Sequence, residues 1–122
     1  KILDALPIIG KSASVADTQI GKPINIGKAG PGRTYREYQK GPYEIRVELE
    51  GTEKIVQINI RKEGGLPGIT SESRSIMNAI GLSDSSPSES TDYGAHWYAK
   101  DGIGRITMQK SDTNPYYTKH KI

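Results

Sequence analysis

The clearest pattern in this chain is an alternation of apolar and polar residues in its middle. Apolar side chains stand at every second position from Tyr43 to Leu49 and again from Val56 to Ile60. A period of two places alternate side chains on opposite faces, so each run predicts a half-buried strand. The turn residues at 50–53 separate the two runs, and the whole segment therefore predicts a hairpin.

Further elements are predicted on both sides of this hairpin. Residues 33–39 predict a third strand, joined to the hairpin through the Gly-Pro turn at 40–42. Ser71 predicts the cap of a short helix over 72–80, which Gly81 closes. Three strand-like runs follow, at 95–99, 105–110 and 116–122. This order predicts an α+β domain in which a small antiparallel β-sheet carries one or two short helices packed on one face.

The remaining segments predict little regular structure. Residues 1–32 are expected to be an N-terminal segment with a short helix near 2–9 and a loop rich in Gly, Ser, Lys and Pro from 11 to 32. Residues 33–122 are expected to form a single α+β catalytic domain. Its Ser-rich stretch at 83–91 predicts an exposed loop. No internal repeat is evident in the sequence.

Composition narrows the range of functions. The chain has 122 residues, enough for one domain, and it contains no Phe and only 34% hydrophobic residues, so its core must be small. It has no Cys, which excludes disulfide scaffolds, thiolate metal sites and cysteine nucleophiles. A formal net charge of +3 is compatible with a polyanionic partner. Because the chain begins at Lys1 rather than Met, we expect a domain cut from a longer protein that carries the targeting information.

The polar residues of the last two predicted strands suggest an anion-binding face. His120 is a candidate acid–base group because only histidine titrates near neutral pH without help. Thr118 stands two positions before His120 and therefore shares its face, and Arg105, Thr107 and Gln109 share a face of the preceding strand. These residues predict an open, anion-binding surface, with a plain solvated sheet face as the alternative.

Glu37 and His96 are the other candidates for catalytic groups. Glu37 lies close to Arg33 and Arg36, whose positive charge favours an ionised carboxylate and hence a general base. The alternative for Glu37 is a surface ion pair with one of these arginines. His96 lies beside Trp97, the only tryptophan, and has either a structural or a catalytic role. If His120 is inert, His96 becomes the leading candidate for the general acid.

Two short runs resemble a known family of enzymes. The run GRTYRE at 32–37, preceded by GKAGP at 27–31, resembles the G-R-T-W-R-E segment of barnase-type microbial ribonucleases. Arg105-Ile106, Asp112 and the run YTKH at 117–120 resemble that family's second signature, which ends in a catalytic histidine. The family joins its two signatures by a short hairpin, whereas 67 residues separate Glu37 from Arg105 here. The resemblance is therefore to the broader barnase, EndoU, colicin and RelE group of ribonuclease toxins.

The resemblance implies a mechanism that needs neither a metal nor another cofactor. Glu37 matches the general base that deprotonates a 2′-hydroxyl, His120 matches the acid that protonates the leaving 5′-oxygen, and Arg105 matches a phosphate-binding arginine. The product would be a 2′,3′-cyclic phosphate, formed from tRNA or another cellular RNA. The remaining predicted substrate-binding residues are Arg36, Lys119, Thr118, Thr107 and Tyr117.

Ribonuclease toxins of this kind form the tips of large secreted effectors, as in contact-dependent growth inhibition. The resemblance thus implies a monomeric toxin domain that is secreted within a larger protein, acts in the cytoplasm of a target cell and is neutralised by a cognate immunity protein. Two other functions stay open. One is a non-catalytic nucleic-acid-binding module that uses the same basic and aromatic residues. The other is an ADP-ribosyltransferase toxin, for which Glu48-Leu49-Glu50 has the required E-x-E form.

Overall fold

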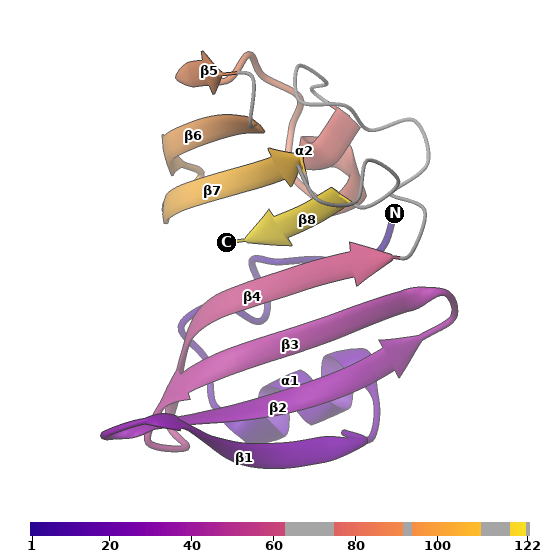
Figure 1. The fold of residues 1–122 in the computed structure, drawn as a ribbon, viewed down its shortest axis with the longest axis vertical. Helices are drawn as coiled ribbons and strands as arrows, with labels where there is room; N and C mark the ends of the chain where they lie inside the picture. The colour runs from indigo at the N-terminus through magenta and orange to yellow at the C-terminus, as the bar shows by residue number, and fades with distance from the viewer. Residues whose placement is uncertain (63–74, 92–93, 111–117, 122) are drawn as a thin grey trace.

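The strands of this protein form one antiparallel sheet. The computed structural model describes residues 1–62, 75–91, 94–110 and 118–121. Within these residues the sheet has the strand order β1-β2-β3-β4-β8-β7-β6-β5 (Figure 1). The elements are α1 (Ala13–Ile20), β1 (Asn25–Gly30), β2 (Arg33–Lys40), β3 (Tyr43–Glu50), β4 (Lys54–Lys62), α2 (Ser75–Ala79), β5 (Glu89–Thr91), β6 (Gly94–Lys100), β7 (Ile103–Lys110) and β8 (Thr118–Lys121).

The predicted α+β class with an antiparallel sheet is confirmed. Each predicted strand from 33 onward corresponds to an observed strand. For β3 and β4 the reason is the alternation that a half-buried sheet requires. Most apolar positions of β3 and β4 are buried, with Ile45, Val47, Leu49, Ile58 and Ile60 at 0–1% exposure. Val56 was predicted on the buried face and is only partly buried, because a register shift next to Leu49 turns Ile55 inward instead. The predicted helix over 72–80 corresponds to α2. Residues 72–74, 116–117 and 122 of the predicted elements lie outside the described residues.

Two predictions about the N-terminal segment are wrong. Residues 2–9 contain turns rather than a helix, and the segment 11–32 contains α1 and β1. The predicted exposed loop at 83–91 is present at 83–88, and its last three residues form β5. Both β1 and β5 are outer strands of the sheet with mostly exposed residues, so they have no apolar alternation, and they exist through pairing with β2 and β6. Strands β1 and β2 lie on either side of the expected boundary at residue 32 and pair directly with each other.

The chain contains an internal repeat that its sequence did not reveal. The element order α-β-β-β-β occurs twice, and the two sets of strands meet at β4 and β8 in mirrored order. Since β4 and β8 are antiparallel, an approximate two-fold rotation between them relates the two halves. The cross-strand pair Tyr38–Ile45 in the first half corresponds to the pair Trp97–Ile106 in the second, and all four side chains are buried.

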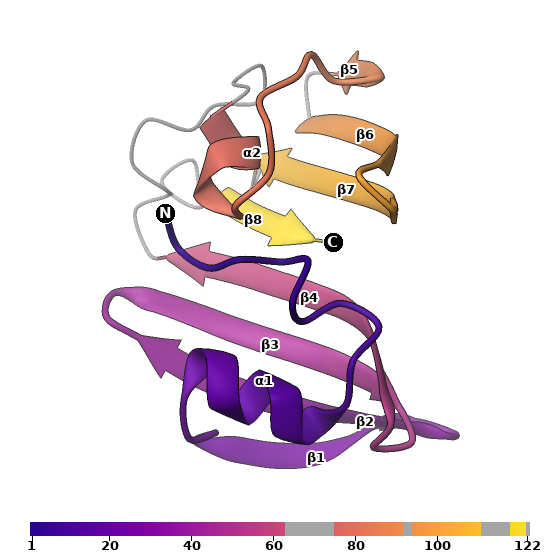
Figure 2. The same ribbon diagram turned by 180° about the vertical axis from the view of Figure 1, so that it is seen from behind.

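The two halves share one core on the helix-bearing face of the sheet. Figure 2 shows α1 lying over the β1–β4 half and α2 over the other half, on the same side. The N-terminal segment joins the halves: the amides of Ile2 and Ala5 donate to the carbonyls of Ala79 and Ile80, and Gly10 bonds to Ile55 of β4. The N-terminal segment, α1 and α2 all lie on this one side of the sheet, so no described helix covers the opposite face (Figures 1 and 2). We call that opposite side the open face.

Candidate functional site

A row of polar residues crosses the open face of the sheet. Directly opposed residues in neighbouring strands share a face, so a row can be followed from one strand to the next. By backbone register, the row that contains Glu37 reaches all eight strands, through the positions of Asn25, Glu37, Arg46, Asn59, Lys121, Thr107, His96 and Glu89. The approximate two-fold axis passes between Asn59 and Lys121. Each half therefore contributes four equivalent positions to one surface.

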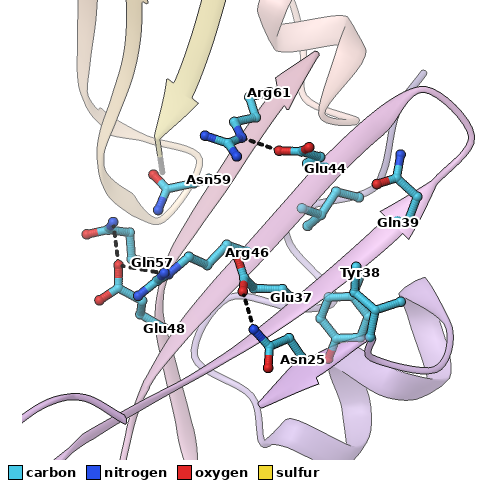
Figure 3. Close-up of a pocket in the computed structure, with 12 residues that line it drawn as sticks. Asn25, Glu37, Tyr38, Gln39, Glu44, Arg46, Glu48, Gln57, Asn59 and Arg61 are labelled. Carbon is cyan, nitrogen blue, oxygen red and sulfur yellow. Dashed lines mark hydrogen bonds and ion pairs between the residues drawn. The ribbon is translucent and has the colours of Figure 1, made fainter. Parts of the chain in front are cut away.

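The first half of this row forms the floor of a pocket of about 670 Å³ on the open face of β1–β4 (Figure 3). The polar side chains around it come from alternate positions of the strands, since the intervening residues face the core. They are Asn25, Glu37, Gln39, Glu44, Arg46, Glu48, Gln57, Asn59 and Arg61. The pocket therefore follows directly from the polar half of the alternation that predicted the hairpin.

Arg46 lies at the centre of the pocket. Its guanidinium carbon is 4.0 Å from the centre of the Tyr35 ring, which is a cation–π contact. The Tyr35 ring in turn lies against Gly27 of β1, where a Cβ atom would come within 2.6 Å of the ring. The Nε atom of Arg46 is buried, has no hydrogen-bond partner, and lies 4.0 Å from the Glu48 carboxylate. Arg46 thus retains an unused donor.

The carboxylates of the pocket differ in their partners. Glu48 accepts a hydrogen bond from Gln57 at 3.1 Å, and Glu44 pairs with Arg61. Glu37 accepts a hydrogen bond from the Asn25 amide at 2.9 Å but has no cation within 4.0 Å among the described residues. The buried Oδ1 atom of Asn59 has no hydrogen-bond partner.

The second half of the row carries a different cluster. The Nδ1 atom of His96 is 2.9 Å from the Thr107 hydroxyl, and the imidazole stacks on Tyr98 with ring centres 6.1 Å apart. The Tyr98 hydroxyl donates to Glu89 at 3.1 Å, and this bond raises the pKa of the phenol. Arg105 is the cross-strand partner of Tyr98. An imidazole, a carboxylate, a phenol and a guanidinium are thus neighbours on β5, β6 and β7.

The structure does not bring the predicted catalytic residues together. Glu37 on β2 and His120 on β8 are separated by three steps between strands, about 14 Å at the usual strand spacing, and Arg105 on β7 is one step further. His120 also belongs to another row, with Ile60 and Met108 as its partners. A base and an acid that act on one phosphodiester must both reach it within hydrogen-bond distance. This arrangement does not support Glu37 and His120 as such a pair.

The predicted substrate-binding residues are also distributed. Arg36 lies on the helix face and pairs with Asp17 at 2.6 Å, where Asp17 also accepts a bond from Tyr38. In β8 the register pairs Thr118 with Lys110 and Lys119 with Gln109, so Thr118 does not stand opposite Thr107 or Gln109 as the predicted polar face required. Thr107 is buried at 4% exposure, and Tyr117 lies outside the described residues.

Sequence reasoning missed Arg46, Asn59 and Asn25. The signal for the first two was present, because both occupy polar positions of the alternating hairpin. The sequence does not single them out, because only the register shows that they meet in one row. Among the described residues, no cluster of three or more His, Asp or Glu side chains is arranged to hold a metal ion. None of the described helices is long and apolar enough to cross a membrane.

Comparison with known proteins gives information on the fold alone. No protein-family model matches the chain, and no curated protein matches it. The structure is similar to part of a cysteine-rich secretory protein from Staphylococcus aureus, with a TM-score of 0.51 and 11% sequence identity. The match covers 93% of this chain and 43% of that one, so the chain spans less than half of its neighbour. At this identity the likeness shows a shared fold and nothing of function.

Proposed function

We propose that this protein is a non-catalytic binding module that holds a polypeptide partner on the open face of its sheet. The observation that carries the proposal is the pair of unmatched buried atoms in the pocket, the donor Arg46 Nε and the acceptor Asn59 Oδ1. Buried polar atoms without partners are costly, and native proteins rarely keep them. Neighbouring side chains cover both atoms. A bound polypeptide that displaces this cover supplies a carbonyl acceptor for Arg46 Nε and an amide donor for Asn59 Oδ1.

The charges of the pocket favour a polypeptide over a nucleic acid. Three carboxylates, those of Glu37, Glu44 and Glu48, face two guanidiniums, those of Arg46 and Arg61. Nucleic-acid sites gather positive charge against the phosphates, and an excess of carboxylates repels them. A protein surface of mixed charge has no such conflict.

Peptide selection tests this proposal. A library of displayed linear peptides is selected on the immobilised protein, and enriched peptides are synthesised and titrated by calorimetry. Arg46→Ala and Asn59→Leu are expected to weaken binding at least about tenfold, which is about 1.4 kcal/mol. Gln19→Ala, an exposed change on α1 at the opposite face, should leave the affinity unchanged. Failure to enrich any peptide, or binding that neither pocket variant weakens, would overturn the proposal.

A second candidate function is metal-independent ribonuclease activity, and the cluster around His96 is the observation that favours it. Here the acid of the mechanism would be His96, with Glu89 as the base that takes the proton of a 2′-hydroxyl. Arg105 would stabilise the charge on the phosphoryl oxygens. All three residues lie on adjacent strands, unlike Glu37 and His120. The toxin role and the immunity partner expected from the sequence depend on this activity.

Incubation of tRNA and total RNA with the protein in EDTA tests the second candidate. Cleavage to a 2′,3′-cyclic phosphate that disappears in His96→Ala and Arg105→Ala but persists in Glu37→Gln supports it. If Glu37→Gln abolishes RNA cleavage and His96→Ala retains it, the catalytic site lies instead in the first half of the row. The absence of any cleavage excludes the enzyme and leaves the binding module.

A further inference from the structure

We infer that the pocket on β1–β4 recognises a basic side chain, arginine or lysine, of the bound polypeptide, with Glu37 as its counter-charge. This inference rests on the proposed binding function and adds the class of residue that is recognised. Three observations support it. One carboxylate of the pocket has no positively charged partner among the described residues, two buried polar atoms have no hydrogen-bond partner, and an exposed apolar side chain lies at the rim.

Glu37 is the carboxylate left without a positive partner. Glu44 pairs with Arg61, and Glu48 has the Arg46 guanidinium at 4.0 Å, whereas no described cation lies within 4.0 Å of Glu37. The Asn25 amide holds one oxygen of Glu37 at 2.9 Å and so orients the carboxylate. An oriented carboxylate in a pocket with an excess of negative charge attracts a cation. An arginine side chain can bind such a carboxylate through two parallel hydrogen bonds.

The two unmatched atoms lie on the same side of this carboxylate in the row, on β3 and β4. Arg46 is the cross-strand partner of Glu37, and Asn59 is the next residue of the same row. Both atoms are buried, so the ligand must first displace the side chains that cover them. Arg46 Nε can then donate to a main-chain carbonyl of the ligand, and Asn59 Oδ1 can accept from a main-chain amide. The main chain would therefore lie over β3 and β4, and the side chain would extend one strand further, to Glu37.

Apolar surface at the rim suits the stem of such a side chain. Ile24 lines the pocket directly before Asn25 and is 69% exposed. Lysine and arginine bury their methylene groups on apolar surface while the charged end reaches a polar partner. A glutamate ligand would place its charge against Glu37, and a short polar ligand would leave Ile24 uncovered.

Capped tripeptides that differ only in the middle residue test the inference. Acetyl-Gly-Xaa-Gly-amide with Arg, Lys, Gln or Glu at Xaa is titrated into the ¹⁵N-labelled protein, and the shifts of the Arg46 Nε–H and neighbouring amides are followed into the millimolar range. We expect the Arg and Lys peptides to bind about tenfold more tightly than the Gln peptide, and the Glu peptide to bind most weakly. Glu37→Gln should reduce the Arg peptide to the affinity of the Gln peptide.

Glu50→Gln is the matched control, because Glu50 is an exposed carboxylate at the end of β3 outside the pocket. Equal affinity for the Gln and Arg peptides, an unaffected Glu37→Gln variant, or no shift with any tripeptide would overturn the inference. The library could instead yield longer peptides that contain no basic residue and that bind the Arg46→Ala variant more weakly than the wild type. That result would support the binding module and refute the recognition of a basic side chain. Failure of both experiments refutes the proposed function itself.

Discussion

Glu37 and His96 occupy equivalent positions in the two halves of the sheet. Each lies on the second strand of its half, directly before the buried aromatic residue of that strand, Tyr38 or Trp97. Both belong to the same cross-strand row, at mirrored distances from the two-fold axis. One scaffold thus presents a carboxylate on one side and an imidazole on the other, and the two halves of the open face differ in chemistry while sharing geometry.

The shared core predicts that the two halves unfold together. Ile45→Ala removes a fully buried side chain from the first half, and we expect a loss of about 3 kcal/mol. The fluorescence of Trp97 in the second half should report the same lowered urea midpoint as far-UV circular dichroism. Ile26→Ala, at a 57% exposed position of β1, is the control and should change stability little. An unchanged Trp97 transition in Ile45→Ala would mean that the halves are independent.

Gly81 is expected to be sensitive to substitution for two reasons. Its φ of +78° disfavours any residue with a Cβ. An added Cβ would also collide with the Asp4 carboxylate oxygen and lie only 3.2 Å from the Asp4 Cα atom. Gly10 has nearly the same φ, +79°, with nothing near its Cβ position. Gly10→Ala should therefore cost about 1 kcal/mol in urea unfolding, and Gly81→Ala should cost clearly more. Equal losses would show that the contact with Asp4 is unimportant.

Gly27 provides the space that the Tyr35 ring occupies beneath Arg46. A glycine inside a strand is usually about 0.5–1 kcal/mol less favourable than alanine, so Gly104→Ala, in open space on β7, should stabilise the protein slightly. Gly27→Ala should not stabilise the protein, because the added Cβ displaces the Tyr35 ring. The NMR signal of the Arg46 Nε–H should shift in this variant, since the ring no longer stacks in the same place. A stability gain equal to that of Gly104→Ala, with no shift, would contradict the stacked arrangement.

Tyr38 makes stability depend on alkaline pH. Burial, and then the hydrogen bond to Asp17, raise the pKa of the Tyr38 phenol above its usual range. A raised pKa in the folded state contributes stability that is fully present below the unfolded pKa, about 10, and is lost as the pH rises further. Urea unfolding of the wild type compared with Tyr38→Phe should show a stability difference that declines above about pH 10. A constant difference up to pH 11.5 would refute this coupling.

The candidate site was only partly predictable, and the reason is register. The alternation of β3 and β4 already separated a core face from a polar face. Glu37 was identified from the neighbouring arginines and from the resemblance of its segment, and only the structure places it on the open side. The partners of Glu37 depend on which residues stand opposite it, and a local pattern does not contain that information. The same limit explains the expectation that Glu37, Arg105 and His120 would meet, although three or four strand spacings separate them.

The sequence by itself determined the α+β class and most of the strands. An apolar/polar alternation is a local pattern, so it indicates the buried face of a strand without knowledge of the strands that pair with it. It did not determine β1 and β5, which are strands only because β2 and β6 offer them unpaired edges. The repeat was decided by the tertiary structure too, since two four-stranded units with different side chains meet at β4 and β8. That pairing joins eight separate polar positions into a single row, and no segment of the chain carries this surface alone.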